Sequence, residues 1–351
     1  MNAPDATSLR LTQFSHGGGC GCKVAPAALR EIIAKSGPNM IPKQLLVGIE
    51  TADDAAVYQL NERQAIVATT DFFMPIVDDP YDFGAIAATN ALSDVYAMGG
   101  TPLFALALVA MPIDRLPLDT VRRILEGGEA TCAKAGIPVA GGHTIDSVEP
   151  IYGLVAIGQV DPVHLKRNVG ARAGDALILG KPLGVGIYSA ALKKQCLDDD
   201  AYAAMIANTT QLNTPGIALG QLDAVHALTD VTGFGLLGHL LEVCRGSHVG
   251  ARIAFDQLPL LSNALDLARA GVVTGASGRN MASYGAEVDC GSRIDPSMRA
   301  LLSDPQTSGG LLVACAEDAV DDVLRIFRAE GFAHAAVIGK CVGGAARVEV
   351  V

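Results

Sequence analysis

The chain of 351 residues contains no tryptophan, and aromatic residues make up only 5% of it. Its longest apolar run, residues 103–111, is too short to cross a bilayer, and its first ten residues lack the apolar core of a secretory signal. Basic residues are outnumbered, 26 against 37 acidic ones, so the formal net charge is −11. These absences argue against a membrane protein and against a general nucleic-acid surface, and they predict a cytoplasmic protein.

The composition that remains is that of a compact α/β protein. Half of the chain is apolar, and its length predicts two domains that each bury a core. Eight cysteines are scattered along it, which does not resemble a disulfide framework in a reducing compartment. Six of them are expected to be small core residues: Cys132, Cys196, Cys244, Cys290, Cys315 and Cys341.

The other two cysteines belong to a glycine-rich segment, Gly17-Gly18-Gly19-Cys20-Gly21-Cys22-Lys23. Glycine costs entropy on folding and permits close approach to a ligand, so the segment is better explained by chemistry than by stability. A neighbouring cation such as Lys23 favours the nucleophilic thiolate. Structural zinc is a weaker interpretation, because no second cysteine pair follows at the required spacing and His16 alone completes nothing.

The apolar patterns predict the main elements of the first half. A short helix is expected over residues 27–36, strands over 64–69, 104–110 and 151–160, and helices over 83–98 and 118–135. The pair Gly127-Gly128 weakens the last helix and hints at close packing. Residues 162–173 read as a connector, which places the domain boundary there. The division is an arm at 1–24, an N-terminal domain at 25–165 and a C-terminal domain at 166–351.

The second half predicts a strand at 176–179, a helix at 187–195, a strand near 251–255 and two strands at the C-terminus. The glycines of residues 180–186 are spaced like an anion cradle at a helix N-terminus, although the segment is not a P-loop. Residues 233–238 fit G-x-G-x-x-G, which allows a dinucleotide interpretation. Against it, Asp230 lies where a pyrophosphate would bind.

Carboxylates follow or interrupt several apolar segments; they are Asp53, Asp54, Asp71, Asp94 and Asp230. Asp94 lies inside an apolar helix, where burying it without a partner would cost several kcal/mol. Asn90 is four residues earlier, on the same helical face. Each aspartate alone could be a cap or a turn residue, but the set together favours a hard cation such as Mg²⁺, with phosphates as further ligands.

Two histidines have local contexts of their own. His143 follows Gly141-Gly142 and either contacts a phosphate or packs in a turn, and the residues alone leave both open. His239 lies in an apolar helix and is expected to be a hydrogen-bonded core residue.

Taken in order, the motifs resemble the selenophosphate synthetase family, over nearly the whole chain. The matching stretches are residues 15–23, 53–57, 69–73, 88–94, 141–143, 229–235 and 304–310. The aspartates and the Thr-Gly-Phe-Gly stretch also occur in ATP-using relatives built like aminoimidazole ribonucleotide synthetase, whereas the Cys-x-Cys-Lys arm separates this family from them. The resemblance implies a two-domain α/β fold whose N-terminal domains pair through their sheets in a homodimer.

The resemblance also implies a reaction and a set of site residues. ATP, selenide and water would give selenophosphate, orthophosphate and AMP, for selenocysteine and selenouridine formation. Cys20 and Lys23 match catalytic positions, with Lys23 also counted among the nucleotide contacts. The magnesium ligands would be Asp54, Asp94 and Asp230. The other nucleotide contacts would be Thr51, Ala52, Asp53, Asp71, Asp94, Gly142, His143 and Thr144, the last three in the partner subunit's site.

Some implications concern cofactors and partners. Mg²⁺ is the expected cofactor, K⁺ is a further candidate, and a selenium-delivery protein is a candidate partner. Ala52 is shorter than the residue common in the family, so any contact there would be through its backbone. The γ-phosphoryl group is expected to pass to selenide before ADP is hydrolysed, with the arm closing over the nucleotide. A selenium or soft-metal carrier without turnover is the alternative, but it leaves the aspartates unexplained.

Overall fold

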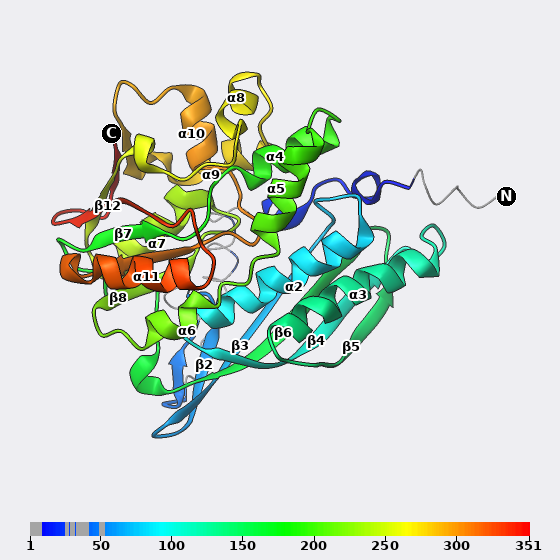
Figure 1. The fold of residues 1–351 in the computed structure, drawn as a ribbon, viewed down its shortest axis with the longest axis horizontal. Helices are drawn as coiled ribbons and strands as arrows, with labels where there is room; N and C mark the ends of the chain where they lie inside the picture. The colour runs from blue at the N-terminus through cyan, green and yellow to red at the C-terminus, as the bar shows by residue number, and fades with distance from the viewer. Residues whose placement is uncertain (1–8, 25–27, 29–31, 33–41, 49–52) are drawn as a thin grey trace.

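A computed structural model of the chain describes residues 9–24, 28, 32, 42–48 and 53–351. The chain forms two β-sheets with helices against them (Figure 1). The first sheet has six strands in the order β1-β2-β3-β6-β4-β5, and only the β4–β5 pair is parallel. Its strands are β1 Leu45–Val47, β2 Ala56–Asn61, β3 Gln64–Phe73, β4 Thr101–Met111, β5 Val139–Asp146 and β6 Ile151–Val160.

One face of this sheet is covered by helices α2 Pro80–Ala97 and α3 Leu118–Lys134 (Figure 1). Asp79 caps α2 by accepting a hydrogen bond from the backbone N–H of Asp82 at 2.9 Å. The two helices approach so closely that a methyl group on Gly127 would lie 2.0 Å from the carbonyl oxygen of Tyr81. Gly127 and Gly128 therefore serve packing, as their position in the sequence indicated.

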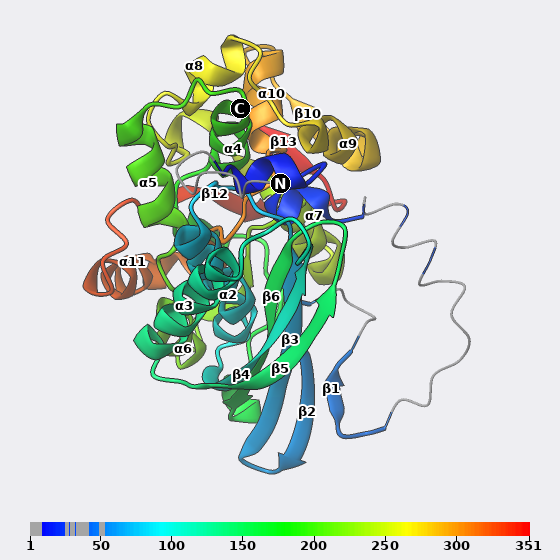
Figure 2. The same ribbon diagram turned by 90° about the vertical axis from the view of Figure 1, so that its right-hand side faces the viewer.

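The other face of the first sheet is not covered by any described helix. Alternate residues of the strands point there, because successive side chains of a strand face opposite sides. Large apolar side chains are exposed on it, including Tyr58, Phe72 and Ile145, which are 42%, 51% and 56% exposed. Figure 2 shows α2 and α3 on one side of the strands only. An exposed apolar area of this kind is typical of an interaction surface.

The second sheet has seven strands in the order β10-β13-β9-β12-β7-β11-β8. They are β7 Ala176–Leu179, β8 Val225–Asp230, β9 Gly250–Ile253, β10 Val288–Cys290, β11 Leu311–Cys315, β12 Ala336–Val342 and β13 Val348–Val350. The helices of this half are α4 Val185–Lys193, α5 Asp199–Thr209, α6 Pro215–Gly220, α7 Gly235–Ser247, α8 Ala264–Arg269, α9 Gly275–Tyr284, α10 Pro296–Leu302 and α11 Val320–Ala329. In α11, Val323 and Phe327 are one turn apart and both are fully buried in the core.

Most predicted elements are present with shifted ends. Strands β6 and β7 begin and end where the pattern placed them, while β3 runs on to Phe73. Strand β5 contains the stretch around Gly142, for which no strand was predicted, because its two glycines hide the alternation. The helix expected over residues 27–36 lies almost wholly outside the described residues. None of the described helices is long and apolar enough to span a bilayer.

The prediction that six cysteines are core residues holds for four of them, which are fully or almost fully buried: Cys132, Cys244, Cys315 and Cys341. It is wrong for Cys196, which is exposed, and Cys290 is half-buried. Cys196 lies just beyond the last turn of α4, where the chain leaves the helix for the surface. A local apolar context therefore does not fix the burial of a residue at the end of an element.

Candidate active site

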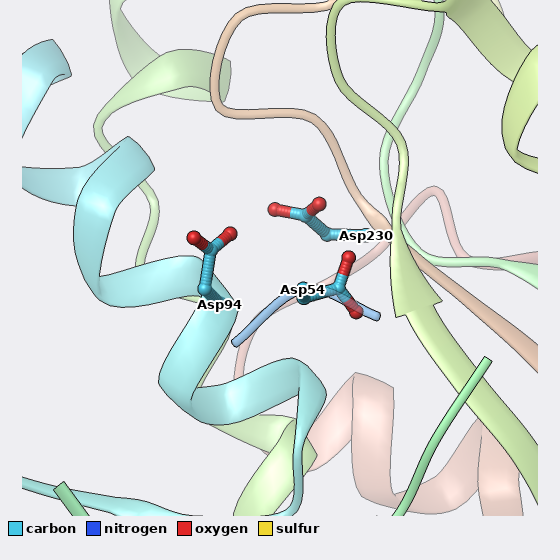
Figure 3. Close-up of side chains that lie close together, drawn as sticks. All are labelled: Asp54, Asp94 and Asp230. Carbon is cyan, nitrogen blue, oxygen red and sulfur yellow. The ribbon is translucent and has the colours of Figure 1, made fainter. Parts of the chain in front are cut away.

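Three aspartates from separate segments meet at the junction of the two sheets. Asp94 comes from the buried helix α2, Asp230 ends strand β8, and Asp54 precedes strand β2. One carboxylate oxygen from each lies within 4.8 Å of the others. Figure 3 shows the three side chains close together, each on a separate segment. The tertiary structure thus brings together the three residues that the resemblance assigned to magnesium.

Hydroxyl groups hold these carboxylates in place. Thr69 of β3 donates a hydrogen bond to Asp94, and Ser93 of α2 donates one to Asp230. The hydroxyl of Thr229 donates to one oxygen of Asp54 at 2.9 Å. The other oxygen, Oδ2 of Asp54, is buried and has no hydrogen-bond partner among the described residues.

The electrostatics of the cluster are unfavourable for three bare carboxylates. Burial and the neighbouring charge of Asp230 raise the pKa of both Asp54 and Asp94 well above the usual range. Burial also raises the pKa of Asp230, although the hydrogen bond from Ser93 opposes the shift. Three converging carboxylates with an unpartnered oxygen form a ligand set of the kind that a hard divalent cation takes. The residues present therefore fit a magnesium ion.

The glycine-rich arm docks beside this cluster. Cys20 is 1% exposed and lies in a single 3₁₀ turn, Gly19–Cys22. Its thiol donates to Oδ1 of Asn90 at 3.2 Å, and its backbone N–H donates to the hydroxyl of Thr307 at 3.0 Å. Burial raises the pKa of Cys20, with Lys23 acting in the opposite direction. In this arrangement Cys20 is held as a thiol.

Asn90 connects the arm to the carboxylates. Its Oδ1 also accepts from the backbone N–H of Ser308 at 2.7 Å, and its Nδ2 donates to Asp71 at 2.6 Å. The sequence placed Asn90 and Asp94 on one helical face toward a shared ligand. The structure shows Asn90 bonded to three protein segments, so its role here is to hold the arm.

Lys23 forms an ion pair with Asp71 of β3, at 2.9 Å from Nζ to Oδ2. Its side chain is still 38% exposed, and a cavity of about 380 Å³ opens beside the pair. Burial alone would lower the pKa of Lys23, but the carboxylate of Asp71 outweighs this and raises it. Lys23 is therefore a permanent cation at the edge of the acidic cluster, facing space that a ligand could enter.

The other predicted nucleotide contacts are placed differently. The Asp53 carboxylate is fully buried and pairs with the guanidinium of Arg167 at 3.0 Å. Thr51 and Ala52 lie outside the described residues. Residues 142–144 lie on β5 at the far edge of the first sheet, and all three are exposed. His143 is thus part of a strand, and the alternative that it packs in a turn is wrong.

One sequence interpretation is corrected at the start of α4. The predicted anion cradle is filled by the protein itself, because the Gln306 side chain accepts from the N–H groups of Gly184 and Val185. Asp304 accepts from the N–H of Ile187. These partners occupy the helix terminus that an anion would need.

The remaining alternatives are also decided. Asp230 ends strand β8 and bonds to Ser93, so it is not a helix cap. His239 is 6% exposed and contacts Thr232 and Glu242, which confirms a hydrogen-bonded core residue. The stretch at 233–238 does open helix α7, but Gly233 lies against the arm, with Cys20 O 2.7 Å from where its side chain would begin.

Sequence reasoning gave no role to several residues that support the site. Asn213 donates to Ser93 at 2.7 Å and to the carbonyl of Gly309 at 2.9 Å. Lys181 is 1% exposed and donates to the carbonyls of Gln211 and Ser308. These contacts join residues 30 to 127 positions apart in the chain, so no local pattern signals them. The loop 304–310 had been marked by its resemblance, but without a function.

Comparison with known families accounts for nearly the whole chain. Residues 52–160 match the family described as AIR synthase related protein, N-terminal domain, and residues 172–351 match its C-terminal domain. A selenide, water dikinase from Paraburkholderia xenovorans (strain LB400) is 65% identical over 350 residues, covering 100% of this chain and 99% of the relative. One from Rhizobium meliloti (strain 1021) is 55% identical over 342 residues, covering 97% and 98%.

Solved structures share the fold at lower identity. A thiamine-monophosphate kinase from Stenotrophomonas maltophilia K279a superimposes with a TM-score of 0.62 at 22% identity, over 92% of this chain and 94% of the other. The E. coli hydrogenase maturation protein HypE gives a TM-score of 0.63 at 20% identity, over 90% and 87%. The arrangement of two sheets is therefore that of the AIR synthase related proteins.

Proposed function

Because the chain belongs to the selenide, water dikinase family, we propose that Asp54, Asp94 and Asp230 hold the magnesium with which it phosphorylates selenide. As a member of that family, the protein is a phosphotransferase that makes selenophosphate from selenide, ATP and water. AMP and orthophosphate are the remaining products, which balances the two phosphate bonds broken in ATP.

The residues divide the work of phosphoryl transfer, in which positioning and charge neutralisation dominate. When bound, magnesium neutralises phosphate oxygens and orients the triphosphate. Lys23 adds a fixed positive charge beside Asp71. Cys20 lies near Lys23 and Asp71. The glycines on either side of it, Gly19 and Gly21, let the turn pack against Ile76 and Pro305. The docked arm covers the cluster and keeps water away from the reacting phosphate.

One observation carries the metal assignment: three carboxylate oxygens within 4.8 Å, one aspartate of the three having a buried oxygen without a partner. Calorimetric titration with magnesium and a non-hydrolysable ATP analogue tests it. Asp230→Asn should weaken binding at least about tenfold, because a neutral amide is a poorer ligand than a carboxylate. Asp200→Asn, at an exposed position on α5, is the matched control. Equal affinities for the two variants would remove Asp230 from the metal site.

The carrier alternative and the enzyme differ in whether ATP is converted to products when selenide is added. Under anaerobic conditions, phosphorus NMR of protein, magnesium and ATP should show AMP, orthophosphate and selenophosphate in equal amounts only after selenide is added. A carrier would bind selenium and leave ATP intact.

We also propose that the uncovered face of the first sheet pairs with a second copy of the chain. Strand register supports this: His143 and Ile145 lie opposite Leu108 and Ala110, so they share the uncovered face. In a dimer, the exposed strand β5 would lie next to the partner, and residues 142–144 could then reach the partner's nucleotide. The apolar side chains of β2, β3 and β5 supply the driving force.

Light scattering after size-exclusion chromatography tests the pairing. Ile145→Asp should shift the protein toward monomer, because it places a charge in the centre of an apolar contact. Val163→Asp is the control, since Val163 is 74% exposed and lies outside the sheet. A dimer that withstands Ile145→Asp at micromolar concentration would place the interface elsewhere.

A further inference from the structure

The arm has a second cavity on its other side. It encloses about 470 Å³ between the arm, helix α4 and the start of helix α9. Cys22, Lys193 and Arg279 are among the residues that line it, and no carboxylate lines it within the described part of the chain. In a protein whose acidic residues outnumber its basic ones 37 to 26, such a lining is a concentration of positive charge.

The two thiols of the arm differ in their access to cavities. A 3₁₀ turn has three residues per turn, so side chains two positions apart point in different directions. Cys20 points inward to Asn90 and is 1% exposed. Cys22 is half-buried and lines this cavity, and it also borders the cavity of about 380 Å³ beside Lys23. It packs over Gly17, where even a methyl group would lie 2.5 Å from its sulfur.

The two cations of the cavity keep unused donors. One guanidinium nitrogen of Arg279 donates to the carbonyl of Gly21 at 3.1 Å, which uses one of its five N–H groups. Among the described residues, Lys193 makes one long hydrogen bond, 3.4 Å to the carbonyl of Ser15. Both side chains are exposed at the rim. They are therefore able to attract and hold a small anion without breaking a strong interaction.

Nearby carboxylates are already engaged. Glu149 accepts hydrogen bonds from the backbone and the ring of His16, at 2.8 and 3.0 Å. Asp78 accepts from Arg10 and Thr12, and Asp304 is buried behind the cavity against Ile187. Their charges lower the potential, but none of these carboxylates lines the cavity beside the thiol and the two cations.

We propose that this cavity is the entry site for hydrogen selenide, which Lys193 and Arg279 bind as an anion beside the thiol of Cys22. The proposal rests on the proposed function, because it names the route of that reaction's substrate. Hydrogen selenide is a soft monoanion at neutral pH. A site with two cations and a sulfur contact therefore suits selenide better than it suits a phosphate, whose oxygens are hard. From this site it has only the thickness of the arm to cross before it reaches Cys20.

Alkylation of Cys22 tests the anion site without turnover. Iodoacetate is anionic and iodoacetamide is neutral, so the ratio of their rates reports anion attraction, while the thiolate fraction cancels. Peptide fragmentation by mass spectrometry assigns the label to Cys22. The double variant Lys193→Met/Arg279→Met should lower this ratio roughly tenfold, the lower end of what charged clefts achieve. Lys194→Met removes a neighbouring cation that does not line the cavity, and should leave the ratio unchanged.

Steady-state kinetics then tests the ligand. The double variant should raise the KM for selenide several-fold and leave the KM for ATP unchanged. An alkylation ratio equal to that of the parent protein would overturn the anion site. A lowered ratio with an unchanged selenide KM would overturn the entry route. The magnesium proposal is tested by nucleotide binding to Asp230→Asn, whereas the entry site is tested by the alkylation ratio and the KM for selenide. Either proposal can therefore fail without the other.

Discussion

The two sides of the glycine-rich arm differ in charge, burial and bonding, although their cysteines are only two residues apart. On the inner side, Cys20 is buried and bonds to Asn90, which in turn bonds to Asp71. On the outer side, Cys22 borders an open cavity with two cations. One turn of backbone therefore separates a site suited to a metal and phosphates from a site suited to a small anion.

The largest expected effect would distinguish the two thiols. Cys20→Ser should lower selenophosphate output on the order of a thousandfold, because a hard alcohol oxygen is a much poorer partner for selenium than sulfur. Cys22→Ser should keep the output within about tenfold, since Cys22 only borders the entry site. Anaerobic phosphorus NMR measures both.

Circular dichroism of each serine variant serves as the control for folding. Equal losses of selenophosphate output in Cys20→Ser and Cys22→Ser would contradict a difference between the two sides of the arm, because the thiols would then act as one unit. A Cys20→Ser enzyme with parental output would remove the thiol from the mechanism altogether.

A second prediction concerns pH and the inner side. The folded carboxyls of Asp54, Asp94 and Asp230 have raised pKa values, so they bind protons more tightly than in the unfolded chain. Their contribution to stability is therefore complete at acidic pH and is lost as pH rises through the folded pKa values. Magnesium binds the ionised form and should restore about 2.7 kcal/mol when its concentration is about a hundred times Kd.

Thermal unfolding measures this linkage. Magnesium should raise the Tm more at pH 7.5 than at pH 5.5, and sodium chloride at matched ionic strength should not. The added stability should disappear in Asp230→Asn. A magnesium shift that is the same at both pH values would show that these carboxyls do not change their protonation on binding.

The smallest expected effect concerns the link between the arm and the cluster. Asn90→Ala removes one hydrogen bond from Asp71, which keeps its ion pair with Lys23, and leaves the N–H of Ser308 without its partner; the loss should cost about 1–3 kcal/mol. The loss should appear as easier opening of the arm. In a Cys22→Ser background, Cys20 should react faster with a thiol reagent, and Ser189→Ala, which removes only a 3.5 Å contact, is the control.

Local pattern predicted most of the regular elements. Helix α2 and strands β3, β4 and β6 follow from runs of apolar residues; β6 has the predicted ends, and the ends of the other three differ by a few positions. Strand β5 was not predicted, because its two glycines interrupt the apolar–polar alternation and glycine does not favour strands. The supposed anion cradle failed for a different reason: Gln306, more than a hundred residues away, fills it.

The sequence by itself determined which residues carry the chemistry: a thiol and an amine on a glycine-rich arm, and carboxylates that follow or interrupt apolar segments. Only the tertiary structure decided that Asp54, Asp94 and Asp230 meet, that Asn90 holds Cys20, and that Cys22 faces a basic cavity. The physical reason is distance along the chain. Periodicity reports which way a side chain points from its own element, whereas a site depends on how separate elements pack, and no local pattern encodes that.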